Sequence, residues 1–269
     1  MDAASKRPPE DATTRFSSRV DDYVRHRPQY PSAVYDFLRD ELGARPPAVV
    51  ADVGSGTGIF AGPLLEAGFE VYCVEPNGAM RAAAERLLGR HPLFHSVDGA
   101  AEATTLPDAF ADLAVAAQAF HWFDVSKAAA EFSRVLRPDA PAALIWNTRR
   151  THGSPFLKAY EELLNEYGTD YAAVRHDRAD PGRLAAFFGG PFRRAAFPNH
   201  QRLDLAGLRG RLLSSSYAPG PGHPRHAAML DAAARLFEPS NHSGFVTIEY
   251  DTELSYGPLQ KLQQSPGRG

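Results

Sequence analysis

The feature that most constrains this chain is an apolar run that ends in an acidic residue and is followed by three glycines at alternate positions. The run Val49–Val53, with Asp52 next to its end, leads directly into Gly54, Gly56 and Gly58. A strand that enters a glycine-rich turn and leaves as a helix brings backbone N–H groups beside a ligand, because no side chain intervenes. The pattern predicts a binding site for a nucleotide-like ligand.

A second apolar run, residues 70–75, ends in Glu75. In an open α/β sheet, a carboxylate at the end of the second strand is placed to accept hydrogen bonds from both ribose hydroxyls of an adenosine. A glycine-rich turn alone is a weak signal, but its combination with this carboxylate is much more specific. The two features together predict an adenosyl cofactor.

The spacing of the glycines distinguishes between two adenosyl cofactors. Dinucleotide-binding folds carry G-x-G-x-x-G/A directly after the first strand. This chain matches that pattern only from Gly56 to Ala61, two residues late, which leaves Gly54 without a role. We therefore favour S-adenosylmethionine, whose aminocarboxypropyl arm would lie over the turn while Asp52 receives its ammonium group or an ordered water. An oxidoreductase that uses NAD(P) is the alternative.

The order of the elements predicts an α/β fold with a doubly wound, mostly parallel sheet. Predicted helices, such as 80–88 and 126–136, alternate with predicted strands at 49–53, 71–75, 94–98, 113–117 and 142–146. Residues 246–256 alternate apolar and polar side chains, as in an antiparallel strand with one exposed face. This strand is expected to pair with 195–203, which is an edge or bulged strand because it contains Pro198.

Residues 151–240 are predicted to form a helical insertion above the carboxyl edge of the sheet. Ser154 and Pro155 begin a helix that Gly168 ends, and further helices are expected at 181–188, 205–214 and 226–237. An insertion at this position can form the roof of a substrate pocket.

Charge and cysteine content exclude several classes of protein. The 269-residue chain has a net charge of −3, which offers no general attraction to nucleic acid or to an anionic membrane. No apolar run reaches transmembrane length, and the single cysteine, Cys73, lies in a predicted buried strand. A chain without an internal disulfide suits a reducing compartment. We predict a cytoplasmic protein that acts on a small molecule, as a monomer or a homodimer.

Several short motifs follow one another in order along the chain. They are Tyr23, Arg27-Pro28-Gln29-Tyr30-Pro31, the segment from Asp52 to Gly58, Glu75-Pro76-Asn77, Ala101-Glu102 with Leu106-Pro107, Gln118-Ala119-Phe120-His121-Trp122-Phe123, and Leu136-Arg137-Pro138. In this order they resemble the class I S-adenosylmethionine-dependent methyltransferases, in particular the small-molecule branch similar to trans-aconitate methyltransferase. The resemblance extends over nearly the whole chain.

The resemblance implies a Rossmann-like sheet in the strand order 3-2-1-4-5-7-6, with strand seven antiparallel. It implies a single methyltransferase domain over residues 16–269, with 46–150 as the cofactor-binding core, 151–240 carrying the helical cap and 1–15 as a disordered leader. The implied cofactor is S-adenosylmethionine, and its expected contacts are Tyr23, Arg27, Asp52, Gly54, Ser55, Gly56, Gly58, Glu75, Pro76, Met80, Ala101, Glu102 and Gln118.

Two departures from the family pattern affect the substrate and the adenine. Many relatives place an acidic residue where this chain has Ala100, so adenine recognition is expected to depend on the backbone near Ala101, on Glu102 or on Asp98. The Asn/Asp-Pro-Pro-Tyr/Phe signature of enzymes that methylate amino groups is absent, because Gln118 begins a different sequence after the fourth strand. The second departure disfavours a nucleobase or an amide nitrogen as the methyl acceptor.

The sulfonium methyl group is already activated, so such an enzyme mainly aligns nucleophile, methyl carbon and sulfur and keeps water out. An ionised carboxylate needs no base, whereas a hydroxyl acceptor gains from one. His121, just after the fourth strand, is the candidate base. Alternatively, it is a structural residue that packs with Trp122.

Arg149 follows the fifth strand, where its guanidinium can hold a substrate carboxylate in bidentate fashion or can simply be solvated. Further expected substrate contacts are Trp122, Trp146 and Tyr217. A third hypothesis is a protein that binds the cofactor without transferring methyl, since a fold does not fix a function. No metal site is expected, because a proline separates the neighbouring His223 and His226.

Overall fold

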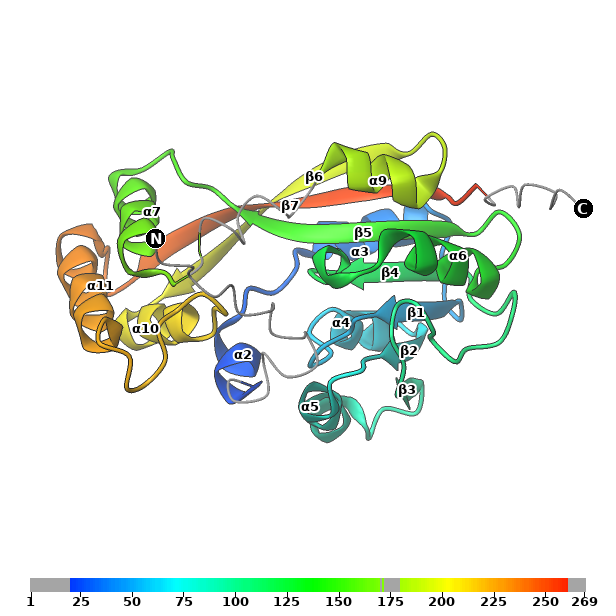
Figure 1. Cartoon of the computed structure of the whole chain (residues 1–269), viewed down its shortest axis with the longest axis horizontal. Helices are drawn as coiled ribbons and strands as arrows, with labels where there is room; N and C mark the ends of the chain where they lie inside the picture. The colour runs from blue at the N-terminus through cyan, green and yellow to red at the C-terminus, as the bar shows by residue number, and fades with distance from the viewer. Residues whose placement is uncertain (1–19, 170, 172–179, 261–269) are drawn as a thin grey trace, which may run out of the picture.

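The computed structural model describes residues 20–169, 171 and 180–260, apart from the side chains of residues 21–23. The predicted leader, 1–15, lies outside these residues. A seven-stranded sheet in the order β3-β2-β1-β4-β5-β7-β6 forms the centre of the molecule (Figure 1). Its strands are β1 (Val49–Val53), β2 (Glu70–Val74), β3 (Phe94–Val97), β4 (Leu113–Ala117), β5 (Pro141–Arg149), β6 (Arg193–Leu203) and β7 (Val246–Pro258).

The pairing of the strands confirms the predicted topology. Strands β1 to β5 pair in parallel, whereas β7 is antiparallel to both β5 and β6. Strand β6 is an edge strand, and its register with β7 runs without a break from Arg193 to Leu203. The edge position tolerates Pro198, which lacks an N–H to donate. The pairing shows no bulge, so the edge interpretation is the correct one.

Helices cover both faces of the sheet, as a doubly wound fold requires. Side chains of α3 (Ser32–Asp40) and α4 (Ala61–Glu66) belong to one apolar cluster against the sheet. Those of α6 (Val125–Val135) and α9 (Pro181–Phe188) belong to another. Helix α5 (Gly78–Leu88) contacts the edge strand β3.

Three helices form a cap at the far end of the long strands (Figure 1). They are α7 (Pro155–Tyr167), α10 (Leu205–Leu213) and α11 (His226–Ser240), and they share an apolar cluster of their own. Strand β7 belongs to both regions: Leu254 packs in the core of the sheet, whereas Ile248 and Tyr250 pack in the cap. The sheet therefore extends from the core into the cap.

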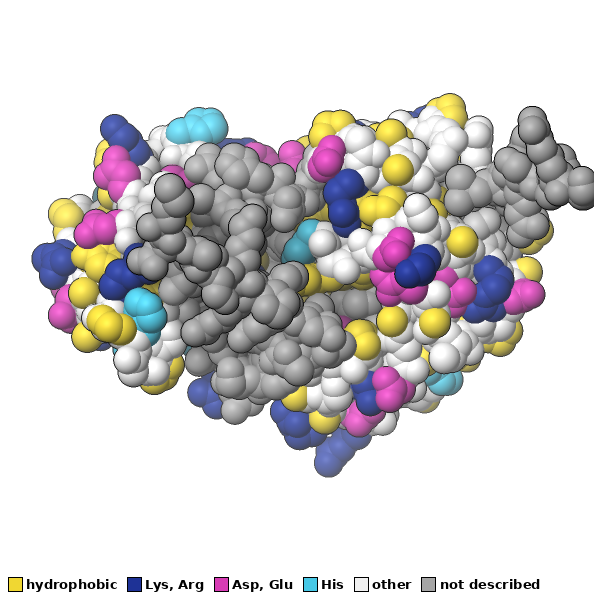
Figure 2. Space-filling model, viewed as in Figure 1, with side chains coloured by type: hydrophobic (Ala, Val, Ile, Leu, Met, Phe, Trp, Pro, Cys, Tyr) yellow, Lys and Arg dark blue, Asp and Glu magenta, His cyan; other side chains and the backbone are white. Residues whose placement is uncertain are grey.

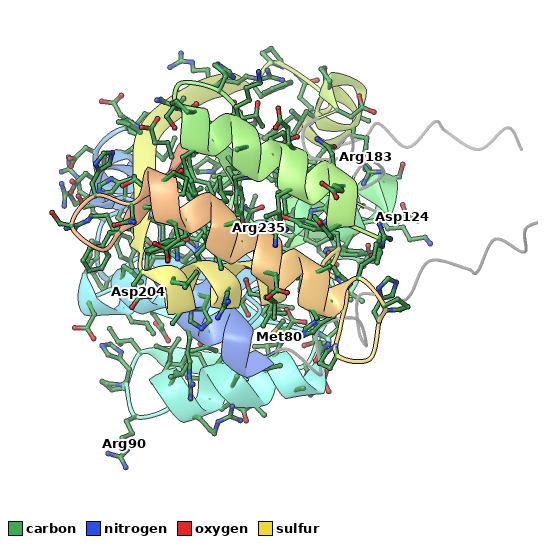
Figure 3. All side chains as sticks on the ribbon, turned by 90° about the vertical axis from the view of Figure 1, so that its left-hand side faces the viewer. Met80, Arg90, Asp124, Arg183, Asp204 and Arg235 are labelled. Carbon is green, nitrogen blue, oxygen red and sulfur yellow. The ribbon has the colours of Figure 1, made fainter. Side chains whose placement is uncertain are left out.

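Helix α2 (Val20–His26), which the sequence pattern does not predict, bridges the core and the cap. Its Val20 packs against Met80 of α5, and Figure 3 places Met80 where these two helices meet. At the other end, the ring of His26 lies directly against Gly210 of α10. The Gln201 side chain also donates a 2.9 Å hydrogen bond to the His26 carbonyl. Tertiary contacts, rather than an amphipathic pattern, hold this short helix.

The surface carries no strongly charged face in the view of Figure 2, where basic and acidic side chains are interspersed among the described residues. None of the described helices combines the length and apolar character that crossing a bilayer requires.

Candidate cofactor and substrate site

The three glycines after β1 all adopt left-handed backbone conformations. The φ angles of Gly54, Gly56 and Gly58 are +71°, +58° and +81°. A Cβ atom on Gly54 would lie 2.5 Å from the Cβ of Ala119, whereas a Cβ on Gly56 would meet nothing within 4 Å. Left-handed backbone strongly favours glycine. The turn is therefore packed on one side and faces open space on the other.

Glu75 connects the glycine-rich turn to the end of β2. One of its carboxylate oxygens accepts a 2.8 Å hydrogen bond from the Gly56 N–H, and the other accepts a 2.8 Å bond from the Asn77 N–H. Burial raises the pKa of Glu75, and these two N–H groups oppose that rise. The carboxylate thus lies beside the turn, as the two sequence motifs together predict.

Asp52 is the most unusual group at this end of the site. Its side chain is fully buried, and neither carboxylate oxygen has a hydrogen-bond partner among the described residues. Burial, and then the neighbouring Glu75 carboxylate, raises the pKa of Asp52 to about 7. A buried carboxylate without a donor is costly, and a cationic ligand or a ligand N–H group would relieve that cost.

These residues fit S-adenosylmethionine. The open face of the turn at Gly56 leaves room that a side chain would fill, and Asp52 offers a carboxylate to a ligand that carries positive charge. Glu75 supplies the second carboxylate expected of an adenosyl site. Asp52, Gly56 and Glu75 would hold the cofactor.

Other predicted cofactor contacts have roles in the protein itself. Pro76 lies between Glu75 and Asn77, whose side chain caps α5 by accepting bonds from the N–H groups of Ala79 and Met80. Met80 is buried against α2. The Ser55 N–H donates to the Val74 carbonyl at 3.2 Å. Tyr23 falls within α2, but its side chain lies outside the described part of the structure.

Both acidic candidates for adenine recognition have protein partners. The Glu102 carboxylate accepts a 2.7 Å hydrogen bond from the N–H of Asp124, the residue that caps α6. Asp98 forms a 2.9 Å ion pair with Arg81. Ala101, which lies between Asp98 and Glu102 in the sequence, is buried. It belongs to a turn that is closed by backbone pairing of Ala100 with Ala103. The turn around Ala101 stays the candidate for adenine contact.

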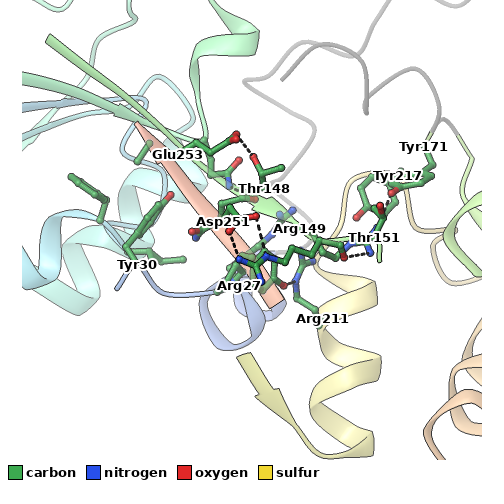
Figure 4. A pocket seen from close by; sticks show the side chains of 18 of the residues that line it. Arg27, Tyr30, Thr148, Arg149, Thr151, Tyr171, Arg211, Tyr217, Asp251 and Glu253 are labelled. Atoms are coloured by element: carbon green, nitrogen blue, oxygen red, sulfur yellow. Dashed lines mark hydrogen bonds and ion pairs between the residues drawn. The ribbon is translucent and has the colours of Figure 1, made fainter. Parts of the chain in front are cut away.

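A pocket of about 720 Å³ extends from the cofactor end of the sheet to the cap (Figure 4). Its cofactor end is lined by Ile59, Phe60, Ala117 and Gln118, and its cap end by Arg149, Tyr171, Arg211 and Tyr217. Residues far apart in the sequence therefore share one cavity.

The pocket brings together four of the predicted site residues, which are Arg27, Gln118, Arg149 and Tyr217. Gln118 has a φ of +59°, and its side chain donates a 3.3 Å hydrogen bond to the Asn147 carbonyl. Arg27 donates a 2.8 Å bond to the Ser214 carbonyl at the end of α10. The ring of Tyr217 packs edge-on against Tyr171 at 4.9 Å. These contacts connect β4, β5, α2 and the cap.

Arg149 is bound to protein partners rather than solvated. Its side chain is 7 % exposed, forms an ion pair with Glu161 of α7 and lies over the ring of Tyr160. It also donates a 2.8 Å hydrogen bond to the Tyr171 hydroxyl. Because Glu161 already neutralises it, Arg149 is a weaker candidate for a substrate clamp than its position after β5 predicts.

The other three residues predicted for catalysis or substrate binding, His121, Trp122 and Trp146, do not line this pocket. His121 and Trp122 lie in a short 3-10 helix, η2 (Phe120–Trp122), with their rings 4.9 Å apart and tilted by 44°. Trp146 is 2 % exposed and packs in the core, edge-on to Phe120 at 6.0 Å. The η2 turn is held from α9, because Arg183 donates a 3.0 Å hydrogen bond to the Phe123 carbonyl.

His152 and Arg211 are among the pocket residues that the sequence pattern does not predict. His152, an exposed residue after β5, lines the pocket in place of His121. Arg211 lines it from α10, on the face of the helix that also carries the buried Leu208 and Leu212. These three positions have i, i+3, i+4 spacing. An arginine on an apolar helical stripe is therefore the sequence feature that could have indicated Arg211 as a site residue.

Within the described ranges, no group of three or more His, Cys, Asp or Glu side chains is arranged to hold a metal ion.

Comparison with known proteins agrees with this geometry. Residues 51–144 match a family model described as a methyltransferase domain. A candidate type II methyltransferase from Anaeromyxobacter dehalogenans has a similar fold, with a TM-score of 0.65 and 24% sequence identity, over 87% of this chain and 99% of that one. At this identity the likeness supports the fold alone.

Two relatives in sequence are also methyltransferases by name. An uncharacterized methyltransferase of Mycobacterium bovis is 37% identical over 139 residues, 52% of this chain and 54% of the relative, so the match spans about half of that protein's length. An uncharacterized methyltransferase-like protein of Schizosaccharomyces pombe is 29% identical over 245 residues, 88% of this chain and 92% of the relative. Residues 51–144 therefore match a methyltransferase domain, and the fold of the chain is the Rossmann-like fold of its methyltransferase neighbours.

Proposed function

We propose that this protein transfers a methyl group from S-adenosylmethionine to an oxygen atom of a small molecule, either a carboxylate or a hydroxyl. The observation that carries the proposal is the arrangement of Asp52, Gly56 and Glu75, two buried carboxylates around an open glycine turn. A pocket lined by Gln118 begins at the same edge of the sheet and offers a place for the acceptor.

When bound, the cofactor supplies an activated methyl group, so the chain itself has three tasks. It binds the cofactor at the turn, orients the acceptor in the pocket, and excludes water from the space between them. The cap contributes to the last two tasks, because Arg211 and Tyr217 wall the pocket from above the sheet. None of these tasks requires an acid or a base.

The pocket favours a carboxylate acceptor over a hydroxyl. A carboxylate is ionised at neutral pH, whereas a hydroxyl gains from a base within hydrogen-bond reach. His121 does not line the pocket, and His152, which does, is exposed. His121 is kept as the candidate base for a hydroxyl acceptor.

The two alternative functions differ from the proposed one in the ligand that is bound or in whether a methyl group is transferred. A dinucleotide oxidoreductase is disfavoured by the match of residues 51–144 to a methyltransferase domain and by the role of Gly54, which packs against Ala119 at the start of the glycine-rich turn. A protein that binds the cofactor without transferring methyl differs from the proposed enzyme only in turnover.

Two measurements test the proposal. Tryptophan fluorescence should show binding of S-adenosylhomocysteine and no response to NAD. Incubation with radiolabelled S-adenosylmethionine and a panel of carboxylic acids and phenols should label at least one carboxylic acid. Binding of NAD in place of S-adenosylhomocysteine would support the oxidoreductase, and binding without labelling would support the third hypothesis.

A matched pair of variants tests the cofactor site itself. Glu75 lies after the carboxyl end of β2 and Glu70 begins the same strand, where it contacts His95. We expect Glu75→Gln to weaken S-adenosylhomocysteine binding by about 10-fold to 100-fold, the value of one hydrogen bond to a charged group. Glu70→Gln should leave the affinity unchanged. Equal effects of the two substitutions would contradict the site.

A further inference from the structure

Arg211 is a buried cation at the cap end of the pocket. Its side chain comes from α10, is 6 % exposed and lines the pocket (Figure 4). The Nε atom donates a 3.2 Å hydrogen bond to the Tyr250 hydroxyl, and Nη1 donates a 2.8 Å bond to the Ser215 hydroxyl and a 3.5 Å bond to that of Ser214. All of these acceptors are neutral.

Arg211 differs from Arg149, the last residue of β5, and from Arg150, the residue after it. Arg149 pairs with Glu161, and Arg150 pairs with Asp251. Arg211 forms no ion pair with any described residue, and its Nη2 atom makes no hydrogen bond there. Charged side chains are almost never buried unless they are paired. A buried guanidinium that keeps free N–H groups at the wall of a pocket is arranged to pair with an anion from outside the protein.

An anion held by Arg211 would be a different group from the oxygen that is methylated. A carboxylate held by a guanidinium has its charge neutralised and is a poorer nucleophile. Arg211 also belongs to the cap, whereas the glycine turn at Gly56 follows β1 in the core. Residues of both the core, such as Gln118, and the cap line the pocket, and its volume of about 720 Å³ accommodates a small molecule.

We propose that Arg211 is a specificity-determining residue, which anchors an anionic group of the acceptor other than the oxygen that receives the methyl group. This inference rests on the proposed function, because it names the acceptor as a molecule with a carboxylate or phosphate anchor in addition to its reacting oxygen. The neutral hydroxyls of Tyr250 and Ser215 fix the guanidinium plane and leave Nη2 for the anchor.

Calorimetry on the 269-residue chain saturated with S-adenosylhomocysteine tests this inference. The probes are short dicarboxylates, phosphocarboxylates of the same length, and the monoamides of the dicarboxylates, which lack one charge. We expect the wild type to bind at least one doubly anionic series about tenfold or more tightly than the monoamides. The two anionic series identify whether the anchor is a carboxylate or a phosphate.

Arg211→Met should remove the preference for the doubly anionic probe, and Arg211→Lys should keep part of it. The matched control is Arg202→Met, since Arg202 lies outside the pocket over the ring of Phe245 and should leave the preference intact. Affinity for S-adenosylhomocysteine should stay within about threefold in all three variants, which also reports that they are folded.

The inference is overturned if the wild type binds monoamides as tightly as dianions, if it binds none of the probes, or if Arg211→Met retains the preference. The Arg211→Lys variant tests the same point should the methionine variant not fold, because a preference equal to that of the wild type contradicts a planar, bidentate anchor. Failure of the proposed function has a separate signature, the loss of S-adenosylhomocysteine binding by the wild type.

Discussion

The cofactor turn and the cap end of the pocket are built in different ways. The turn is made by one short stretch, from Asp52 to Gly58, together with Glu75, and its shape depends on backbone conformation. The cap end is made by side chains from separate elements, including Arg149 of β5 and Arg211 of α10. Local sequence can specify the first kind of site, whereas the second exists only when distant segments meet.

The cofactor turn and the cap end of the pocket also each hold a buried charge without a partner of opposite sign in the described part of the chain. Asp52 is a buried carboxylate without a hydrogen-bond partner among the described residues, and Arg211 is a buried guanidinium without an acidic partner there. A ligand could therefore supply a positive charge beside Asp52 in the core and a negative charge beside Arg211 in the cap. A cationic cofactor and an anionic acceptor together would satisfy both.

The largest effect is expected from breaking the ion pair between Arg149 and Glu161 in the cap. Glu161→Gln leaves Arg149 buried without its carboxylate, which should lower the free energy of unfolding by about 3–5 kcal/mol, as measured by urea titration. The double variant Arg149→Met with Glu161→Leu should recover most of this loss, because it buries no charge. A loss under about 1 kcal/mol in the single variant would show that the pair contributes little to the cap.

The buried carboxylate of Asp52 should make the stability of the protein depend on pH. The pKa of Asp52 is raised to about 7 in the folded protein, so the folded state holds more protons than the unfolded state between pH 4 and pH 7. Stability should therefore fall as pH rises through this window, by roughly 4 kcal/mol at most, and then level off. Urea titrations of the wild type and Asp52→Asn should differ in slope within this window and run parallel above it.

Binding of a cationic ligand should favour the ionised form of Asp52. S-adenosylmethionine is therefore expected to release a proton when it binds at pH 6, which calorimetry in two buffers of different ionisation enthalpy detects. Proton uptake at this pH would contradict the placement of positive charge beside Asp52.

A pair of glycine substitutions separates backbone strain from ligand contact. Gly56 and Gly43 have φ values of +58° and +70°, and a Cβ on either would meet no atom within 4 Å. Gly56→Ala and Gly43→Ala should each lower stability by about 1–2 kcal/mol. Only Gly56→Ala should weaken S-adenosylhomocysteine binding, by about tenfold or more in calorimetry. Normal binding by Gly56→Ala would remove the turn from the cofactor site.

The smallest effect is expected at His121. Since His121 does not line the pocket, His121→Ala should change the turnover of a carboxylate acceptor by no more than about twofold in the radiolabel assay. A hydroxyl acceptor that needs a base would instead lose about 100-fold or more. If the turnover of a carboxylate acceptor also fell by about 100-fold, His121 would act by positioning other residues of the site.

Local patterns predict most of the elements correctly. The helix from Pro155 begins after Ser154, whose hydroxyl accepts a 3.2 Å hydrogen bond from Leu157 N–H, and α9 has the predicted bounds, Pro181–Phe188. Both depend on capping and proline rules that act within one turn. Strand β5 is longer than predicted and reaches Arg149, because it pairs with β7 as far as Tyr250. That extension needs a partner strand about 100 residues away.

The candidate substrate residues are harder to predict. Trp146 has the position expected of a substrate contact, at the end of the predicted fifth strand, but packs in the core beside Phe120. Arg149 follows that predicted strand, and Glu161 neutralises it. Arg211 lies on an apolar helical stripe, where the pattern by itself predicts no site. Which arginine keeps its charge unpaired depends on the acidic residues that folding brings near each one.

The sequence by itself determined the glycine turn, the carboxylate after β2 and the order of strands, because each follows from conformational preferences and hydrophobic periodicity over a few residues. Only the tertiary structure decided the charge state of the pocket. It placed Glu161 beside Arg149 and left Arg211 with hydroxyl partners, since electrostatic pairing in the interior depends on contacts between α7, α10 and β5 that no local pattern contains.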